Sequence, residues 1–322
     1  MNKVKIITIA CWTITAVVLI GLVAWAFVGV APFGTDGPLN WFGNFGAERF
    51  SGPFEEQARE EITIDDINSV YINWTAGTVM VSRHEGGEII LIESAQRELR
   101  DGESFGVSTS GGTLSVEFTT RQRLRNMPAK NLEILLPQEL YELETFRIRT
   151  TSANVEIDDL IVSTLIDIST VSGFVEASQI QARTLDISTT SGRIDARGVN
   201  AIDANLRSVS GRIEVENGNL ENVNSRTTSG RVQLGGEFRY IYARSVSGRV
   251  EITNGIVPND LQVNTTSGRI AISLRDEGEP LSVSYSTVSG RFTSEIPVLS
   301  GVADAQIRLS TISGRIDIYE LR

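Results

Sequence analysis

The feature that most constrains this sequence is a Ser-Gly pair that returns at near-regular intervals in the second half of the chain. At residues 189–194 the unit reads Thr-Thr-Ser-Gly-Arg-Ile, and every copy except the first has Arg directly after the Gly. Successive glycines are 18 to 24 residues apart, at Gly173, Gly192, Gly211, Gly230, Gly248, Gly268, Gly290 and Gly314. A repeat of about this length is typical of a solenoid, in which each coil packs only on its neighbours.

The residues around each Gly alternate between apolar and polar. Seven and five residues before the Gly, and two and four residues after it, most copies carry an apolar residue, as with Leu185, Ile187, Ile194 and Ala196 around Gly192. Alternation with a period of two is typical of a strand with one buried face. The sequence therefore predicts an all-β, single-domain β-solenoid similar to a parallel β-helix, with two short strands and about 19–24 residues per coil.

The alternation changes phase at the Gly, so a corner or bulge has to absorb one residue there. Glycine tolerates backbone angles that a Cβ atom would block, and we expect it to take such angles here. Every copy has Ser or Thr three residues before the Gly. Parity predicts that this hydroxyl and the Ser of the Ser-Gly pair point inward, where they can bond to the corner backbone. A second corner is predicted at Gly198, Asn217-Gly218, Gly235-Gly236 and Asn254-Gly255.

The N-terminus differs from the rest of the chain. Residues 1–5 include Lys3 and Lys5, and residues 6–31 carry no charge. Because about 20 apolar residues can cross a bilayer as a helix, 6–31 are predicted to be a single transmembrane signal anchor in the cell membrane, with 1–5 in the cytoplasm and the C-terminal domain extracellular. A cleaved signal peptide is the alternative, since Ala24-Trp25-Ala26 fits a cleavage site, but the apolar run continues past that point.

Between the anchor and the regular repeats the pattern is looser. Residues 32–60 are rich in Gly, Pro and aromatic residues, and they predict a linker. Residues 61–145 contain alternating segments around Gly77 and Gly112, and they predict irregular β coils of the kind expected at the end of a solenoid. Residues 146–322 predict the regular coils.

The composition argues against several classes of function. The net charge of −11 disfavours nucleic acid as a partner. Cys11, the one cysteine, lies in the predicted span, which leaves no thiol nucleophile or cysteine zinc site outside the membrane. The one histidine, His84, lies in a predicted turn, and the acidic pairs Asp65-Asp66 and Asp158-Asp159 are adjacent residues that suit turns better than acid–base catalysis. We therefore predict that the protein is not an enzyme and has no catalytic residues, metal site or cofactor.

The arginines that follow the glycines form the strongest candidate for a site. Stacked coils would place them about 4.8 Å apart in one column. Acidic residues often follow two positions later, as Asp195 and Glu214 do, so one interpretation is a solvated ladder of arginines and carboxylates. The other is a binding strip for anionic envelope polymers, because Arg recognises phosphate and carboxylate. The predicted strip consists of Arg193, Arg212, Arg231, Arg249, Arg269, Arg291 and Arg315.

The repeated Thr/Val-Ser-Gly-Arg-Ile/Val unit behind an N-terminal apolar segment resembles the bacterial putative-adhesin family of membrane-anchored β-strand-repeat proteins. The resemblance extends from residue 62 to the C-terminus and is strongest over 150–322. It implies a cell-envelope protein with a β-solenoid outside the membrane, and it brings no catalytic residues with it. Some members of the family are associated with envelope-stress operons.

Three functions are consistent with these observations. The first is a non-enzymatic, adhesin-like or envelope-interaction module that contacts cell-wall polymer. The second is an envelope-stress accessory protein that binds a membrane sensor protein. The third is a β-helix enzyme that acts on polysaccharides, and it is disfavoured because no cluster of acidic or basic residues interrupts the repeat.

Overall fold

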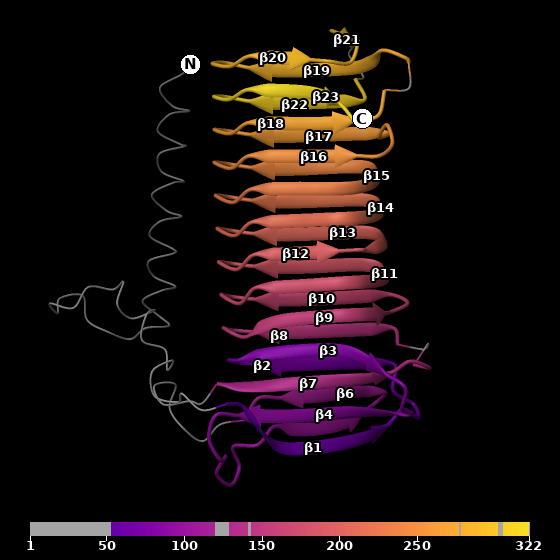
Figure 1. Cartoon of the computed structure of the whole chain (residues 1–322), viewed down its shortest axis with the longest axis vertical. Coiled ribbons are helices and arrows are strands. Elements are labelled where there is room, and N and C mark those ends of the chain that lie inside the picture. The colour runs from indigo at the N-terminus through magenta and orange to yellow at the C-terminus, as the bar shows by residue number, and fades with distance from the viewer. Residues whose placement is uncertain (1–52, 120–128, 141–142, 277, 302–304, 322) are drawn as a thin grey trace, which may run out of the picture. The chain divides into compact units, whose positions relative to one another are not determined.

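The structure is a computed structural model that describes residues 53–119, 129–140, 143–276, 278–301 and 305–321. These residues form 23 strands that stack as the coils of a solenoid (Figure 1). The prediction of an all-β solenoid is confirmed for this part of the chain. No helix able to span a membrane occurs among the described residues, and the predicted span at 6–31 lies outside them.

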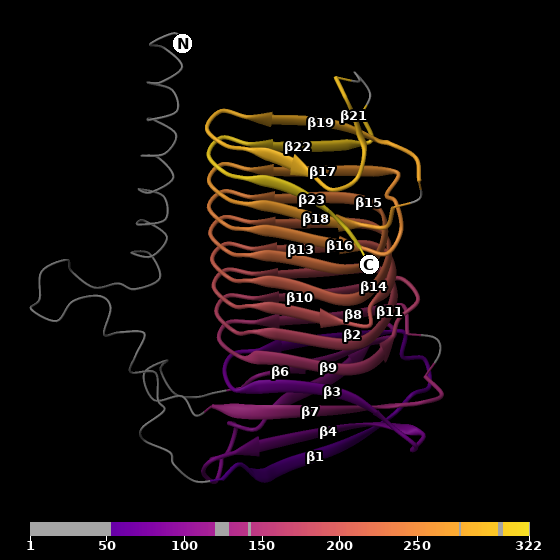
Figure 2. The same ribbon diagram turned by 45° about the horizontal axis from the view of Figure 1, so that its top comes forward.

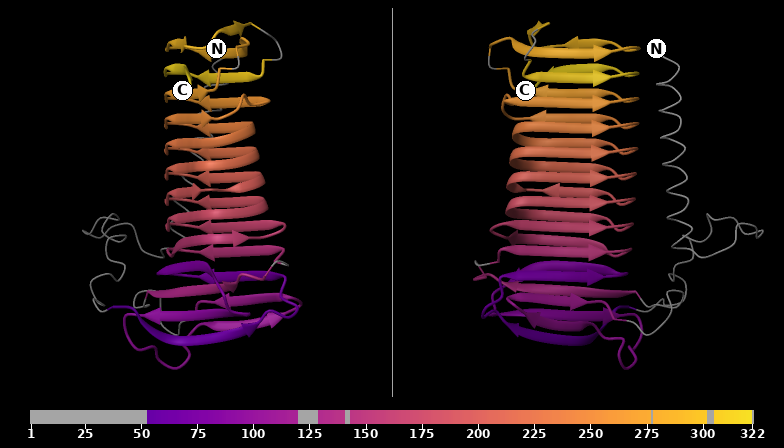
Figure 3. Two further views of the ribbon diagram at one scale, coloured as in Figure 1. Left: turned by 45° about the vertical axis from the view of Figure 1, so that its right-hand side comes forward. Right: turned by 180° about the vertical axis from the view of Figure 1, so that it is seen from behind.

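Two faces made of strands run along the solenoid (Figure 3). We call the face formed by strands before each Ser-Gly pair the leading face, and the face formed by strands after it the trailing face. In spatial order, the leading face consists of β5 (Gly106–Ser110), β6 (Thr113–Glu117), β2 (Ser69–Trp74), β8 (Thr145–Thr150), β10 (Leu165–Thr170), the second half of β11 (Val175–Thr189), β13 (Asn200–Ser208), the second halves of β14 (Ile213–Thr227) and β15 (Val232–Ser245), β17 (Asp260–Thr265), β22 (Ile307–Thr311), β19 (Leu281–Thr287) and β21 (Val298–Ser300).

The trailing face follows the same order of coils. It consists of β1 (Glu55–Thr63), β4 (Glu88–Ala95), β7 (Lys130–Pro137), β3 (Thr78–His84), β9 (Asn154–Ile161), the first half of β11, β12 (Ile194–Arg197), the first halves of β14 and β15, β16 (Val250–Asn254), β18 (Ile270–Leu274), β23 (Ile316–Glu320) and β20 (Phe292–Ser294). All pairs are parallel except β1–β4, β4–β7 and β5–β6. β1 begins at Glu55, inside the range 32–60 that the sequence assigns to a linker. The sequence pattern does not predict this strand because its many charged residues hide the alternation of apolar and polar side chains.

The core is built from the predicted apolar columns. Ile194, Ile213 and Val232 occupy the same position in three successive coils, and none of them is exposed to solvent. Each such column continues through the stack because the strands pair in register. Burial of these aliphatic side chains supplies the main favourable free energy of folding.

At the first corner the hydroxyl residue three residues before the Gly is buried, as predicted, in every copy except that of Thr287, which is half-buried. Thr227 Oγ1 accepts a hydrogen bond from the N–H of Gly230 at 3.0 Å and donates one to the carbonyl oxygen of Gly211, in the previous coil, at 3.4 Å. The prediction for the Ser of the Ser-Gly pair is wrong, since Ser210 and Ser229 are exposed. The chain has already left the strand at these residues, so the parity that predicts an inward side chain no longer applies.

The reason for Gly at this corner also differs from the prediction. Gly211, Gly230 and Gly248 do not have left-handed backbone angles. Instead, a Cβ atom on Gly230 would lie 1.8 Å from the carbonyl oxygen of Gly211, and one on Gly248 would lie 1.7 Å from that of Gly230. Glycine is therefore required because successive coils approach so closely here that no side chain fits between them.

The second corner is where left-handed angles occur. Gln179, Gly198 and Asn217 hold the equivalent position in three coils, with φ of 54°, 62° and 53°. In β11, β14 and β15 the strand continues through this corner, so the second strand of one coil and the first strand of the next form one long strand. The prediction of two separate short strands per coil therefore fails in these coils, because a single left-handed residue bends the chain without ending the ladder.

The coils at both ends do not stack in the order of the sequence. The coil of β22 and β23 lies between that of β17 and β18 and that of β19 and β20, so the last repeat occupies the last position but one (Figures 1 and 2). At the other end, β2 and β3 pair directly with β8 and β9, whereas β4 to β7 lie beyond them. The chain thus runs out to each end and doubles back.

A buried ion pair stabilises the N-terminal end of the solenoid. Lys130 Nζ on β7 lies 2.6 Å from Glu93 Oε1 on β4, and neither side chain is exposed. Burial lowers the pKa of Lys130 and raises the pKa of Glu93, because both charged forms lose water. The ammonium group also donates to the carbonyl oxygen of Glu103 at 2.6 Å and lies 4.1 Å from the centre of the Phe118 ring. These contacts replace water and hold the irregular strands together.

Asp317 on β23 connects its own coil to the coils on both sides of it, one of which is not its neighbour in the order of the sequence. Its fully buried carboxylate accepts from Arg269 at 2.8 Å, in the coil on one side, and from Thr293 in the coil on the other side. It also pairs with Arg315 of its own coil. Burial alone would raise the pKa of Asp317, but the hydrogen bonds from Thr293, Arg315 and Arg269 outweigh it, so the pKa lies below its usual value.

We predict that Gly230→Ala lowers the free energy of unfolding by about 3 kcal/mol, because the new methyl group must push two coil backbones apart. Gly87→Ala is the matched control, since a Cβ atom there meets nothing within 4 Å and its φ is not left-handed. It should change stability by less than about 0.5 kcal/mol. Chemical denaturation of the full-length variants measures both, and equal stabilities would contradict the close contact.

We predict that Asp317→Asn lowers the free energy of unfolding by about 1–3 kcal/mol at pH 7, because the amide cannot hold two guanidinium groups. A carboxylate whose pKa is lowered by folding stabilises the protein above its unfolded pKa and loses this effect as the pH falls through the folded value. The gap between wild type and variant should therefore narrow below a pH of about 4. Denaturation series at several pH values test this. Asp158→Asn, at an exposed residue, is the control, and a gap independent of pH would contradict the role of the charge.

Candidate functional site

The structure brings the seven predicted arginines together in one column beside the first corner. Along the column up to Arg315, the N–H of the residue after the arginine donates to the carbonyl oxygen of the arginine in the next coil, as from Ile194 to Arg212 and from Ile213 to Arg231, each at 2.9 Å. The spatial order along the column is Arg193, Arg212, Arg231, Arg249, Arg269, Arg315 and Arg291. Arg315 and Arg291 are exchanged relative to the sequence because of the doubling back described above.

Most of this column is neutralised by neighbouring carboxylates. The ion pairs are Arg193–Asp195 at 2.7 Å, Arg212–Glu214 at 3.1 Å, Arg249–Glu251 at 3.0 Å, and Arg269 and Arg315 with Asp317 at 2.8 and 2.5 Å. Among the described residues, no ion pair involves Arg231 or Arg291. At Arg231 the reason is visible in the sequence, since Gln233 stands where other copies have an acid. An arginine that already holds a carboxylate has less to offer a ligand.

A second column of arginines lies on the leading face, and the sequence analysis does not identify it. Arg207, Arg226 and Arg244 are paired in register on β13, β14 and β15, and all three are exposed. No ion pair involves any of them in the part of the chain that the structure describes. Arg226 donates to Asn224 Oδ1 at 3.0 Å, and its guanidinium lies 5.0 Å from the centre of the Tyr242 ring. Three adjacent positive charges are thus left without a counter-charge.

Apolar and hydroxyl side chains flank this column on the side of the first corner. Val209 is 48 % exposed and Val246 is 38 % exposed, with Thr228 between them. Together with the three arginines they line a shallow depression of about 360 Å³. The signal was present in the sequence: an arginine stands four residues before the Gly in three successive copies, with no acid two residues to either side.

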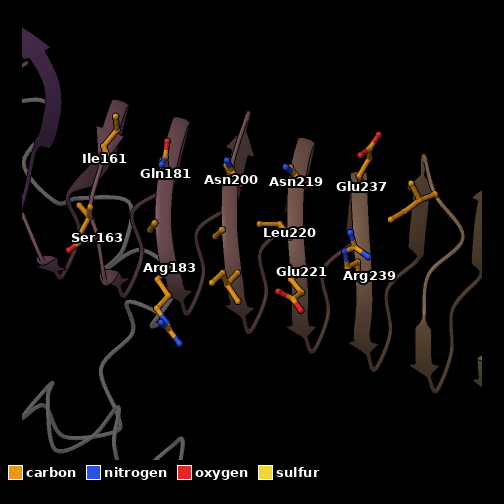
Figure 4. A pocket seen from close by; sticks show the side chains of 15 residues that line it. Ile161, Ser163, Gln181, Arg183, Asn200, Asn219, Leu220, Glu221, Glu237 and Arg239 are labelled. Atoms are coloured by element: carbon orange, nitrogen blue, oxygen red, sulfur yellow. The ribbon is translucent and has the colours of Figure 1, made fainter. Parts of the chain in front are cut away.

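A groove of about 610 Å³ crosses the coils just past the second corner (Figure 4). Two rows of outward side chains border it. One row contains Gln181, Asn200, Asn219 and Glu237, and the other contains Arg183, Ile202, Glu221 and Arg239. Sequence reasoning missed this groove because neither row contains identical residues.

The described residues contain no group of three or more His, Asp, Glu or Cys side chains that could hold a metal ion. His84 bridges the turn between β3 and β4, where its ring contacts the carbonyl oxygen of Glu88 at 2.8 Å and accepts from the N–H of Gly86 at 3.0 Å. Asp159 has a left-handed φ of 55° at the second corner, which is a structural position. Within the described part of the chain, neither His84 nor Asp159 has a partner arranged for acid–base chemistry.

Comparison with solved structures finds likenesses to proteins of bacteria. A putative adhesin from Parabacteroides merdae matches with a TM-score of 0.54 and 12 % identity, covering 82 % of this chain and 96 % of that one. A putative adhesin from Bacteroides fragilis matches with a TM-score of 0.40 and 15 % identity, over the same shares of the two chains. At these identities the first likeness shows the fold alone, and the second is too distant for any inference.

A search of curated proteins gave no match. Residues 67–319, which include both arginine columns and the groove, match the family described as Toastrack DUF4097. This match confirms the resemblance to the bacterial putative-adhesin family, whose function is unknown. The chain belongs to the Toastrack DUF4097 family.

Proposed function

We propose that this chain is a non-enzymatic, adhesin-like module of the cell envelope that holds an anionic polymer along its solenoid. The observation that carries this proposal is the exposed column of Arg207, Arg226 and Arg244, which has no carboxylate partner among the described residues. The description of the Parabacteroides merdae structure as a putative adhesin supports the same class of function.

The two arginine columns differ in how far the repulsion between their like charges is relieved. Like charges directly opposite one another on neighbouring strands destabilise a sheet. Beside the first corner this repulsion is relieved by acids such as Asp195 and Asp317, whereas among the described residues no carboxylate pairs with Arg226 or its neighbours. In a chain with a net charge of −11, such a column is a local site for anions. An external anion would supply the missing counter-charge.

The shape of the site suits a polymer better than a small anion. Arginines recur once per coil, about 4.8 Å apart, so successive acidic groups of an extended chain can each meet a guanidinium. Tyr242 and the exposed Val209 and Val246 offer apolar contact beside them. Arg231, from the predicted strip, lies five residues after Arg226 on the other side of the corner and adds to the same positive region.

The proposal includes the predicted membrane anchor at residues 6–31. An apolar segment of this length after Lys3 and Lys5 would fix the chain in the cell membrane, with the solenoid extracellular and facing the polymers of the envelope. Such polymers carry phosphate or carboxylate groups, both of which Arg binds in bidentate fashion.

We predict that the triple variant Arg207→Gln, Arg226→Gln, Arg244→Gln binds anionic polymers at least tenfold more weakly than the wild type. The probes are inorganic polyphosphate and polygalacturonate, measured by calorimetry with the full-length chain at low salt. The control triple is Arg193→Gln, Arg212→Gln, Arg249→Gln, which removes the same charge from ion-paired, similarly exposed residues. It should stay within about threefold, because those guanidiniums are already paired. Equal losses in both triples would show that only net charge matters and would overturn the proposed site.

We predict that protease added to intact cells, or to cells stripped of their wall, removes the part of the chain after residue 31. The N-terminal segment should remain with the membrane and keep its original N-terminus. Immunoblotting with a tag at the C-terminus and N-terminal sequencing of the mature protein measure this. A solenoid that is protected until lysis, or a mature N-terminus near Ala26, would contradict the anchored arrangement.

A further inference from the structure

The groove past the second corner points to a ligand that the arginine columns would not select. We infer that it binds a neutral, extended glycan chain lying along the solenoid axis. This inference goes beyond the proposed function, because the groove lies beside a different corner from the arginine columns and has a different chemistry.

The first observation is a row of amide side chains without partners. Gln181, Asn200 and Asn219 are exposed along one border of the groove, in register on β11, β13 and β14. Within the described ranges, none of these three amides makes a side-chain hydrogen bond. Figure 4 shows them on the same side of successive strands. Each amide offers two donors and an acceptor, a set that suits the hydroxyl groups of sugars.

Other amides of this solenoid behave differently. On the leading face, Asn205 donates to Asp186 at 2.7 Å and Asn222 donates to Asp203 at 2.8 Å, so these side chains satisfy one another from coil to coil. Such internal bonds are structural, since a stacked amide finds its partner in the next coil. The amides of the groove have the same strand spacing but no internal bonds, and this leaves them available to a ligand.

The charges around the groove cancel. Arg183 and Arg239 stand on one border, Glu221 stands between them, and Glu237 stands on the opposite border. Two positive and two negative groups give no net attraction for a polyanion. A neutral ligand is therefore favoured here, in contrast to the column of Arg207, Arg226 and Arg244.

The floor and the repeat of the groove fit a chain of sugar units. Ala182 and Ala201 lie between the two borders, and their small side chains are 8 % and 7 % exposed, so a ligand can approach the backbone closely. Ile202, which is 42 % exposed, offers an apolar surface for the C–H face of a sugar ring. Equivalent groups recur about every 4.8 Å. This distance is close to the advance of an extended β-linked pyranose chain per sugar.

A hydrogen-bonded turn lines part of the groove. The fully buried Asn254 donates to the carbonyl oxygens of Phe238 at 2.8 Å and Ile256 at 2.9 Å, and it accepts from the N–H of Phe238 at 2.7 Å. Ile256 lines the groove beside these bonds. These bonds fix the backbone at Ile256 in the absence of ligand, and a preformed site reduces the ordering cost of binding.

The test is calorimetric titration of the full-length chain with the neutral hexasaccharides cellohexaose and chitohexaose, and with the anionic hexamer of galacturonic acid. We expect at least one neutral hexamer to bind, and the variant Asn200→Ala, Asn219→Ala to weaken it at least tenfold. The matched control is Asn205→Ala, Asn222→Ala, which removes two amides that are bonded internally. It should bind within about twofold of wild type. Thermal unfolding of both variants shows that they are folded.

Three outcomes would overturn the inference. Two are no binding of either neutral hexamer by the wild type and equal weakening by the two pairs of substitutions. Because the arginine column would itself bind galacturonate, the third is measured in the variant Arg207→Gln, Arg226→Gln, Arg244→Gln, and it is tighter binding of the galacturonate hexamer than of the neutral ones. The first two outcomes do not bear on the arginine column, because they leave Arg207, Arg226 and Arg244 in place. Conversely, loss of polyanion binding in the arginine triple variant would leave neutral glycan binding at the groove unchanged.

Discussion

The contact on which the structure depends is the approach of one glycine to another at the first corner. The Cα of Gly230 lies against the carbonyl oxygen of Gly211, and Gly248 lies against Gly230 in the same way, so closely that a Cβ atom would overlap. The hydroxyl of Thr227 completes the corner by accepting from one glycine and donating to the other. Because this contact recurs in coil after coil, it fixes both the separation of the coils and their register. The buried aliphatic columns and the surface columns follow from that register.

Because the strands of successive coils pair in register, side chains at one position of the repeat form a column along the surface. Where the side chains of a column satisfy one another, as in the ladder of Asp186 and Asn205, the result is structural. Where they do not, as with Arg207 and Arg226 or with Asn200 and Asn219, the same regular spacing produces an array of groups without partners among the described residues. The difference between a structural column and a candidate binding column in this solenoid is therefore whether the partner lies in the next coil or would have to come from outside.

The ends of the solenoid are stabilised by different means from the middle. At the N-terminal end a charged strand, β1, and the buried pair of Lys130 and Glu93 hold antiparallel strands against the regular coils. At the C-terminal end Asp317 joins three successive coils through Arg269, Arg315 and Thr293. Burying a charge is costly in free energy unless the charge is paired. Glu93 and Asp317 therefore stabilise only the arrangement of coils that brings their partners next to them.

The sequence by itself determined the solenoid, the inward apolar columns and the single column of arginines after the glycines, because all of these depend on the position of a residue within one repeat. It also contained the signal for Arg207, Arg226 and Arg244, four residues before each Gly. Only the tertiary structure decided why the glycines are needed, which amides are left without partners and in which order the end coils stack. These properties depend on contacts between coils. A periodic sequence fixes what each coil presents, but the coil that lies against it is selected by packing between segments far apart in the chain, as where β22 and β23 enter between two earlier coils.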